Sequence, residues 1–406
     1  MTAVLNGVKV LELATWTFVP AAGAVLSDWG ADVIKVEHAE TGDPQRGLSV
    51  GNLSAAGSDS VSYIFEQPNR GKRSFGLNVS TEKGRELLLE LAKKCDVFIT
   101  NLLPESLERA RLTVEDLRAA NPKIIYARGT GQGVRGPDAN KAGYDGTAYM
   151  ARGGVAHLLK AEDSDWPALQ RPALGDIVGG FAIAAGIAAA LYRRAETGEP
   201  SVVDVSLLGL AAWQLSPDLV AADMLGPENV PVFSVNDRPN PLVGYYRTSD
   251  GRFLNLVMLQ ADRFWPEVCE LLERPDLLTD ERFATAPARY ENRGACIEQL
   301  RAAFATRPLA QWRERMEGLK GAWAVVQTPG EILVDPQVEA NGYLRPVEYP
   351  DAVTHHLVAN PVQFDETPPE LVRAPAMGQH TDEILENDLG LDWDTIIALK
   401  VDSVVN

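Results

Sequence analysis

One stretch of the sequence limits the possible folds more than any other, residues 171–194, which read RPALGDIVGGFAIAAGIAAALYRR. No residue from Ile177 to Tyr192 is charged, and Asp176 stands immediately before that run. The run is shorter than the about 20 apolar residues that a membrane span needs. It therefore predicts a helix buried in a protein core, whose glycines and alanines let neighbouring backbone come close.

Asp176 has two interpretations. As an N-cap, its carboxylate would accept hydrogen bonds from the free N–H groups of the first helical turn, a position for which Asp is strongly preferred. As a nucleophile, it would attack a substrate, and the same N–H groups would stabilise an oxyanion beside it. Gly179 and Gly180 follow one turn later and would leave room for that substrate. Residue type favours the cap, and the local sequence leaves both interpretations open.

Length and charge limit the class of protein. The 406 residues are enough for two domains, each with its own core. The net charge of −18 argues against nucleic acid and against an anionic membrane as partners, because both select basic surfaces. Five scattered histidines lack metal-ligand spacing, so no metal is expected. Three distant cysteines and an N-terminus without a secretion signal predict a cytoplasmic protein with reduced thiols (Cys95, Cys269 and Cys296).

The N-terminal region has the pattern of an α/β fold. Val8–Leu13 and Asp32–Glu37 are short apolar runs typical of buried strands, and Pro20–Trp29 between them has helical spacing. Strand, helix and strand within about 30 residues predict a βαβ unit and a parallel sheet. The segment after the first strand contains no G-x-G-x-x-G, so NAD binding is not expected.

Polar and glycine-rich segments follow the next two predicted strands. Asn101 comes directly after Asp96–Thr100, and the loop Gly129–Gly136 follows Lys123–Ala127. Ligands bind at the C-terminal edge of open α/β sheets, so both positions are candidate ligand contacts. Gly143–Asp145 then opens a further predicted helix.

The basic segment Asn69–Ser74 (NRGKRS) concentrates three positive charges in an acidic protein. Charge clusters are usually solvated turns. The alternative is a phosphate contact, because Arg binds phosphate with a planar fork and Lys as a point charge. The residues alone leave both interpretations open.

The domain organisation follows from composition. Residues 1–220 are expected to form the N-terminal part of a large domain, and the Pro-containing segment 221–241 a linker. Residues 242–330 contain a hairpin pattern and amphipathic helices, which predict a smaller α+β domain. Residues 331–406 are expected to return to the large domain.

Eight motifs, in consistent order from about Gly7 to Leu399, resemble the family III CoA-transferases. This is the CaiB/BaiF group, which includes formyl-CoA transferase and shares its fold with the α-methylacyl-CoA racemases. The motifs are VLELATWTFVPAAGAVLSDWGADVIKVEHAETGDPQRG, NRGKRSFGLNV, GYDGTAYMARGG, ALGDIVGG, VDVSLL, GYYRTSDGRFL, RFATAPARYENR and GQHTDEIL.

The resemblance implies a fold and a ligand. The fold is a large Rossmann-like domain with a parallel sheet that lacks the dinucleotide glycine fingerprint, built from both ends of the chain, plus a smaller α+β domain. Two chains interlock as a homodimer. Coenzyme A or acyl-CoA binds as substrate at the C-terminal edge of the sheet, with a carboxylic acid as second substrate and without metal or NAD.

The resemblance also implies roles for individual residues. Asp176 falls on the family's nucleophile. With that role, backbone N–H groups near Gly179 and Gly180 are candidates for an oxyanion site. Tyr144 and Asp145 are expected to shape the acyl pocket, and a plain helix start is the alternative role for Asp145. Trp16, Phe18 and Trp213 are candidates for an apolar acyl wall. The glycine-rich lid of some relatives has no counterpart in the stretch VMLQADRFW. The positions that fall on CoA-contacting segments are Thr15, Trp16, Thr17, Phe18, His38 (often Arg in relatives), Arg73, Ser74, Phe75, Asn101, Leu102 and Arg109.

Tyr144 separates the two activities of this fold. In the racemases a histidine at that position pairs with the aspartate that corresponds to Asp176. A phenol with an ordinary pKa near 10 is a poor proton shuttle at neutral pH. The sequence therefore favours a CoA-transferase over a racemase and over a non-catalytic CoA-binding protein, and it names neither the acyl donor nor the acceptor.

Overall fold

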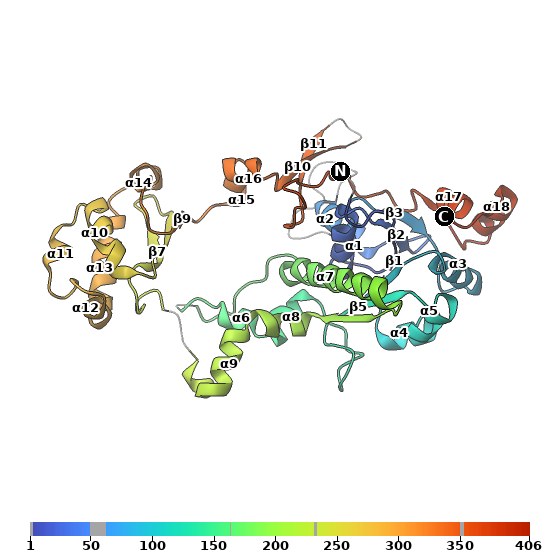
Figure 1. Ribbon diagram of the computed structural model, residues 1–406, viewed down its shortest axis with the longest axis horizontal. Helices are drawn as coiled ribbons and strands as arrows, with labels where there is room; N and C mark the ends of the chain where they lie inside the picture. The colour runs from blue at the N-terminus through green and yellow to red at the C-terminus, as the bar shows by residue number, and fades with distance from the viewer. Residues whose placement is uncertain (1–2, 49–61, 163, 231–233, 350–352) are drawn as a thin grey trace. The chain divides into compact units, whose positions relative to one another are not determined.

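The computed structural model describes residues 3–48, 62–162, 164–230, 234–349 and 353–406 (Figure 1). The chain divides into two compact units. The large unit comprises Met1–Leu219 and Pro336–Asn406, and the small unit comprises Val220–Asp335. The large unit is thus built from both ends of the chain.

A six-stranded parallel sheet forms the centre of the large unit, with the order β3-β2-β1-β4-β5-β6. The chain order changes direction between β1 and β4, which is the switch point where ligands bind in such sheets. The predicted α/β fold with a parallel sheet is confirmed. The strands are β1 (Lys9–Leu13), β2 (Asp32–Glu37), β3 (Arg73–Gly76), β4 (Val97–Thr100), β5 (Ile125–Thr130) and β6 (Val202–Ser206).

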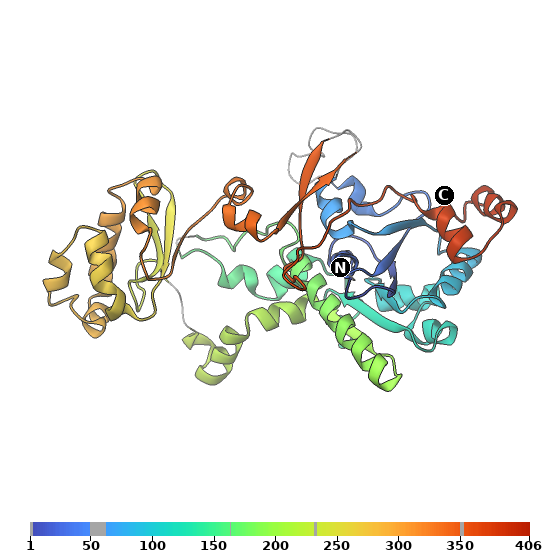
Figure 2. The same cartoon turned by 45° about the horizontal axis from the view of Figure 1, so that its top comes forward.

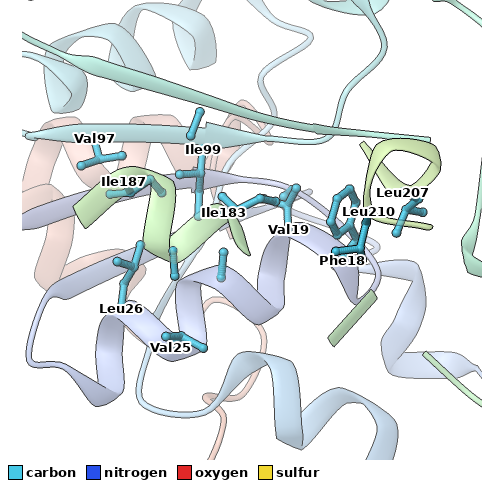
Figure 3. Close-up of a cluster of buried hydrophobic side chains, with 14 of the residues drawn as sticks. Phe18, Val19, Val25, Leu26, Val97, Ile99, Ile183, Ile187, Leu207 and Leu210 are labelled. Carbon is cyan, nitrogen blue, oxygen red and sulfur yellow. The ribbon is translucent and has the colours of Figure 1, made fainter. Parts of the chain in front are cut away.

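Helices cover both faces of this sheet, so its strands are apolar on both sides. On β4, Val97 and Ile99 point into one core and Phe98 into the other, as the two-residue period of a strand requires. Figure 3 shows Val97 and Ile99 above Ile183 and Ile187 of helix α7. The first core contains α1 (Phe18–Asp28) and α7 (Leu174–Thr197), and the second α3 (Glu82–Ala92), α5 (Val114–Ala120) and α18 (Trp393–Val401).

Helices α1 and α7 pack closely because of two glycines (Figure 3). A Cβ on Gly179 would lie 2.4 Å from the Phe18 ring, and one on Gly180 would lie 2.5 Å from Ala21 Cβ. Among the described residues, α7 is the one helix long and apolar enough to cross a membrane. Its packing against α1 is that of a core helix, as predicted.

The C-terminal segment closes the outer edge of the sheet beside β3 (Figure 2). The Asn78 N–H donates to the Val404 carbonyl over 2.8 Å, and the Ser74 N–H donates to His380 Nδ1 over 3.1 Å. Arg73 pairs with Asp32 over 2.6 Å and with Asp388 over 2.7 Å. The solvated turn considered for the basic segment is therefore wrong, because Arg70 and Lys72 are buried in ion pairs and Arg73 begins strand β3.

Shorter elements complete the large unit. Helix α9 (Ser216–Leu225) begins in the large unit and continues into residues of the small unit, so the first residues of the predicted linker are helical. The remaining elements are η1 (Pro44–Gly47), α2 (Tyr63–Asn69), α4 (Pro104–Ala110), η2 (Asp145–Arg152), α6 (Val155–Leu158), α8 (Leu207–Gln214), α16 (Pro336–Ala340), β10 (Leu344–Glu348), β11 (Thr354–Val358), α17 (Thr381–Glu383) and η4 (Ile384–Asp388).

The small unit has its own core around an antiparallel sheet in the order β7-β8-β9. Tyr246, Trp265, Phe304 and Trp312 are buried in it. The predicted hairpin is confirmed, since β7 and β8 pair across the turn at residues 248–251. Its elements are η3 (Pro227–Asn229), β7 (Val243–Arg247), β8 (Phe253–Val257), α10 (Ala261–Leu271), α11 (Asp276–Thr279), α12 (Ala286–Glu291), α13 (Arg293–Phe304), α14 (Leu309–Met316), β9 (Trp323–Val325) and α15 (Pro329–Ile332).

Candidate active site

Asp176 is the third residue of helix α7, inside its first turn. The N-cap position is taken by Ala173, which has a left-handed backbone (φ 58°) and makes no side-chain cap bond. The N-cap interpretation of Asp176 is therefore wrong. A different residue satisfies this helix end, because the Gly175 N–H donates to Asp145 Oδ1 over 3.0 Å.

Asp145 is a buried, well-partnered carboxylate. Its second oxygen accepts from Gln170 Nε2 over 3.0 Å, and the residue is only 3% exposed. Burial raises its pKa, and the hydrogen bonds from Gly175 and Gln170 oppose that rise. Asp145 therefore fixes the start of α7, and its side chain does not line the cavity that Asp176 faces.

Asp176 has a different environment. Its carboxylate has no hydrogen-bond or ion-pair partner within the described ranges. Burial raises its pKa to about 7, and the negative charge of the nearby Asp145 adds to the rise. A carboxylate that is desolvated and unpaired at a cavity is a candidate for chemistry, since structural carboxylates are usually paired.

Asp176 lines a cavity of about 290 Å³ at the switch point of the sheet. Several predicted residues meet it there, from the turn after β1, the turn after β4 and the segment before η2. They are Thr15, Trp16, Phe18, Asn101, Leu102 and Tyr144. The cavity thus combines a reactive carboxylate with mainly apolar and aromatic walls.

Other lining residues were missed from the sequence, although the glycine-rich loop after β5 was noted as a candidate ligand contact. Gly131 of this loop lies against Gly143, since a Cβ on Gly131 would lie 2.6 Å from Gly143 Cα. Both positions therefore need glycine, which was the available signal. Gly129, Thr130 and Gly131 line the cavity and belong to the loop that the sequence marked as a candidate ligand contact. The missed residues are Leu103, Ser106, Ala142, Gly143 and Leu207.

The predicted oxyanion site at Gly179 and Gly180 is wrong. Both lie in the second turn of α7, where backbone N–H groups bond to carbonyls four residues earlier. Both are also buried against Phe18 and Ala21. Their function is to let α1 approach, and no oxyanion donor is assigned in their place.

Several predicted CoA contacts lie outside the cavity. The side chains of Ser74 and Phe75 are completely buried, and Thr17 is buried with its Oγ1 accepting from Gln45. The structure contradicts ligand contacts by these three side chains. The other residues outside the cavity are Arg73, held in ion pairs, His38 and Arg109, both exposed, and Trp213, 77% exposed.

Comparison with known proteins agrees with this arrangement. The model of CoA-transferase family III matches residues 5–381. The chain belongs to CoA-transferase family III. The protein is accordingly an enzyme of the acyl-CoA:carboxylate CoA-transferase type.

Named relatives and a solved structure support the family assignment. The chain is 33% identical over 403 residues to (R)-2-hydroxy-4-methylpentanoate CoA-transferase of Clostridioides difficile, covering 99% of each chain. It is 33% identical over 406 residues to cinnamoyl-CoA:phenyllactate CoA-transferase of Clostridium sporogenes, covering 99% of this chain and 97% of that one. The structure of a CaiB/BaiF family protein from Brucella suis has a TM-score of 0.83 and 31% identity, covering 97% of this chain and 100% of that one.

Proposed function

We propose that this family III enzyme transfers CoA from an acyl-CoA to a carboxylic acid through covalent intermediates on Asp176. The observation that carries the proposal is the unpaired carboxylate of Asp176 at the cavity, with burial raising its pKa to about 7. A desolvated carboxylate is a stronger nucleophile than one surrounded by water. Deprotonation near neutral pH makes this nucleophile available.

The proposed reaction conserves the thioester energy. The Asp176 carboxylate attacks the donor's thioester carbonyl, which gives a mixed anhydride and CoA thiolate. The thiolate attacks the aspartyl carbonyl, giving an aspartyl-CoA thioester and the free donor acid. The acceptor carboxylate attacks that thioester, forming a second anhydride, and the released thiolate attacks the acceptor acyl group. Acceptor-CoA leaves, and Asp176 returns as a carboxylate.

The cavity supports thioester chemistry beside Asp176. Phe18 and Leu102 form apolar walls that would exclude water from an anhydride. Thr15, Trp16 and Asn101 lie at the C-terminal edge of the sheet, where the CoA arm is proposed to bind. His38 and Arg109 remain proposed contacts for the distal part of CoA. Arg73 is not retained as a contact, because it begins β3 at the opposite edge of the sheet and pairs there with Asp32 and Asp388.

Racemisation is a weaker alternative. It needs one base on each face of the α-carbon, and Tyr144 occupies the position at which the racemases have histidine. The Tyr144 ring packs edge-on against Trp16, with ring centres 5.9 Å apart. We propose that Tyr144 shapes the acyl pocket and transfers no proton.

The likeness to relatives suggests the type of acid. One relative is named for a branched hydroxy acid and another for phenyllactate. The aromatic side chains of Trp16, Phe18 and Tyr144 beside Asp176 would pack well against such apolar side chains. We therefore propose carboxylic acids with an apolar side chain as substrates.

We also propose that the enzyme acts as an interlocked cytoplasmic homodimer. Trp166, Leu169 and Trp213 are 78%, 88% and 77% exposed in the single chain. Large apolar side chains that are this exposed are typical of interaction surfaces. A second chain would cover them, and sedimentation velocity measures its presence.

Isotope exchange tests the function. The enzyme is incubated in deuterated water with 4-methylpentanoyl-CoA, whose α-hydrogens can exchange, with and without phenyllactate, and the products are read by mass spectrometry. A CoA-transferase produces phenyllactyl-CoA only when the acceptor is present and leaves the donor's α-hydrogens unexchanged. Deuterium uptake at the α-carbon without acceptor would support a racemase, and CoA binding without either reaction would support a binding protein.

A further inference from the structure

The turn from β1 into α1, residues 14–17, contains a strained residue at the cavity. Trp16 has a left-handed backbone with φ 67°, although a bulky side chain disfavours that region. Glycine would adopt it freely. Such an outlier persists only where its surroundings enforce it, and these outliers concentrate at functional sites.

Asn101 holds the turn from the neighbouring strand. Its Nδ2 donates to the Thr15 carbonyl over 2.6 Å, and its Oδ1 accepts from the Thr15 N–H over 3.2 Å. Asn101 follows β4, so this amide bridges the two strands that flank the switch point. Both polar groups of its side chain are used within the protein.

Asp43 holds the turn from the other side. Its Oδ1 accepts from the Trp16 N–H over 3.2 Å and from the Gln45 N–H over 2.9 Å. Gln45 in turn donates through Nε2 to Thr17 Oγ1 over 2.5 Å. The residues on both sides of the strained position are thus fixed together with it.

A buried ion-pair cluster fixes Asp43 itself. Lys35 Nζ lies 2.9 Å from Asp43 Oδ2 and 3.2 Å from Glu12 Oε1, and all three side chains are completely buried. Lys35 also donates to the Ala14 carbonyl over 2.9 Å. Since buried charges must remain paired, this cluster cannot rearrange to let the turn relax.

We infer that Asp43 and Asn101 are positioning residues, which hold Trp16 in its left-handed conformation so that its ring forms one wall of the substrate cavity. In this position the Trp16 ring packs edge-on against Tyr144, and both residues line the cavity. The effect on catalysis rests on the proposed function, whereas the effect on the Trp16 ring does not. Asn101 acts through the turn and does not bind CoA through its side chain.

Fluorine NMR of the enzyme labelled with 5-fluorotryptophan tests the ring position without any substrate. The Trp16 signal is assigned by its loss in Trp16→Phe. Asn101→Ala and Asp43→Asn are expected to shift or broaden this signal. Asn121→Ala is the matched control, because Asn121 bridges the carbonyls of Ala92 and Cys95 elsewhere in the same unit. An unchanged Trp16 signal in both test variants, with folding retained, would overturn the inference.

A double-mutant cycle then tests the consequence for the substrate. Asn101→Ala and Trp16→Ala are each expected to raise KM for the acyl-CoA by about tenfold, with a smaller change in kcat. The double variant is expected to match Trp16→Ala alone, because Asn101 acts only through that ring. Multiplying effects would show a direct contact of Asn101 with substrate and would contradict the inference. If the variants shift the Trp16 fluorine signal but the wild-type enzyme shows no CoA transfer, the proposed function is refuted and the inference about Trp16 stands.

Discussion

The large unit contains two kinds of buried carboxylate, and their difference separates structure from chemistry. Glu12 and Asp43 are completely buried and paired, with Lys35 bridging both and Lys72 lying 2.7 Å from Glu12. Asp176 is also withdrawn from water, but it has no such partner within the described chain. The paired group fixes a turn, and the unpaired carboxylate remains free to react.

The pKa shifts express the same contrast. Burial lowers the pKa of Lys35, but the charges of Glu12 and Asp43 outweigh it, and the net shift is upward, so Lys35 stays charged. For Lys72, burial outweighs the charge of Glu12 and lowers the pKa to about 7. At Asp176 burial and the Asp145 charge act in the same direction, and both raise the pKa. A buried carboxylate is thus left free to react where the fold provides neither a cation nor a hydrogen-bond donor for it.

The largest expected effect comes from removing the unpaired carboxylate. Asp176→Ala should reduce transfer by about 10⁴-fold or more, because the covalent route is lost. Coupled assays measure the rate, and calorimetry with free CoA checks that binding persists. The control Asp204→Asn breaks an exposed pair with Arg128 and should leave the rate unchanged. A variant at position 176 that keeps substantial activity would exclude the mechanism.

Breaking the paired cluster should affect stability instead. Lys35→Met leaves Asp43 without its cation and is expected to lower the free energy of unfolding by about 3–5 kcal/mol. Denaturant unfolding measures this. The matched control Lys83→Met removes an exposed pair with Glu86 and should cost at most about 0.5 kcal/mol. Equal losses in the two variants would mean that the buried cluster has no special structural role.

Neutralising Asp176 should raise the free energy of unfolding, whereas Lys35→Met should lower it. Its pKa is raised in the fold, so the folded state binds more protons than the unfolded state between about pH 4 and 7. Ionisation therefore costs stability as pH rises through that window, and the cost is complete above pH 7. Asp176→Asn should raise the free energy of unfolding by about 1–3 kcal/mol at pH 8 and by less at pH 5. Intact mass confirms that the amide persists. No gain at pH 8 would contradict an unpaired, desolvated carboxylate.

The smallest expected effect is a shift in the pH dependence of kcat/KM when Asp145, the hydrogen-bonded neighbour of Asp176, is neutralised. In the wild type, kcat/KM should rise with pH through an apparent pKa near 7, because only ionised Asp176 attacks. Asp145→Asn removes the adjacent negative charge, and should move this rise of kcat/KM to lower pH by about half a unit to one unit. The pH profile of kcat/KM in both enzymes measures the shift. If the apparent pKa of kcat/KM does not change in Asp145→Asn, the rise in rate must come from the ionisation of another group.

Local patterns predicted the parts of this protein that local forces determine. The apolar run of α7, the first βαβ unit and the hairpin at residues 248–251 follow from side-chain periodicity and turn residues. Strand β3 was missed because it is short and polar at its start, and its edge is completed by a segment some 300 positions later, at His380. Such distant partners leave no mark on neighbouring residues.

At the candidate site too, the sequence predicted local features and missed contacts between distant residues. Asp176 was singled out because an acidic residue preceded a long apolar helix, but its lack of partners could be seen only in the fold. The bond from Trp16 to Asp43 spans 27 positions, and the bonds from Thr15 to Asn101 span 86. Gly179 and Gly180 were expected to leave room for substrate and to offer backbone N–H groups beside Asp176, and the sequence did not show that α1 takes that space.

The most direct test of the account is to trap the covalent intermediate on the unpaired carboxylate. The enzyme is mixed with cinnamoyl-CoA and hydroxylamine, digested, and analysed by peptide mass spectrometry. We predict an aspartyl hydroxamate at Asp176, formed only with acyl-CoA present and absent from Asp176→Ala. Active transferase that yields no modification at Asp176, or a hydroxamate at another carboxylate, would contradict the account.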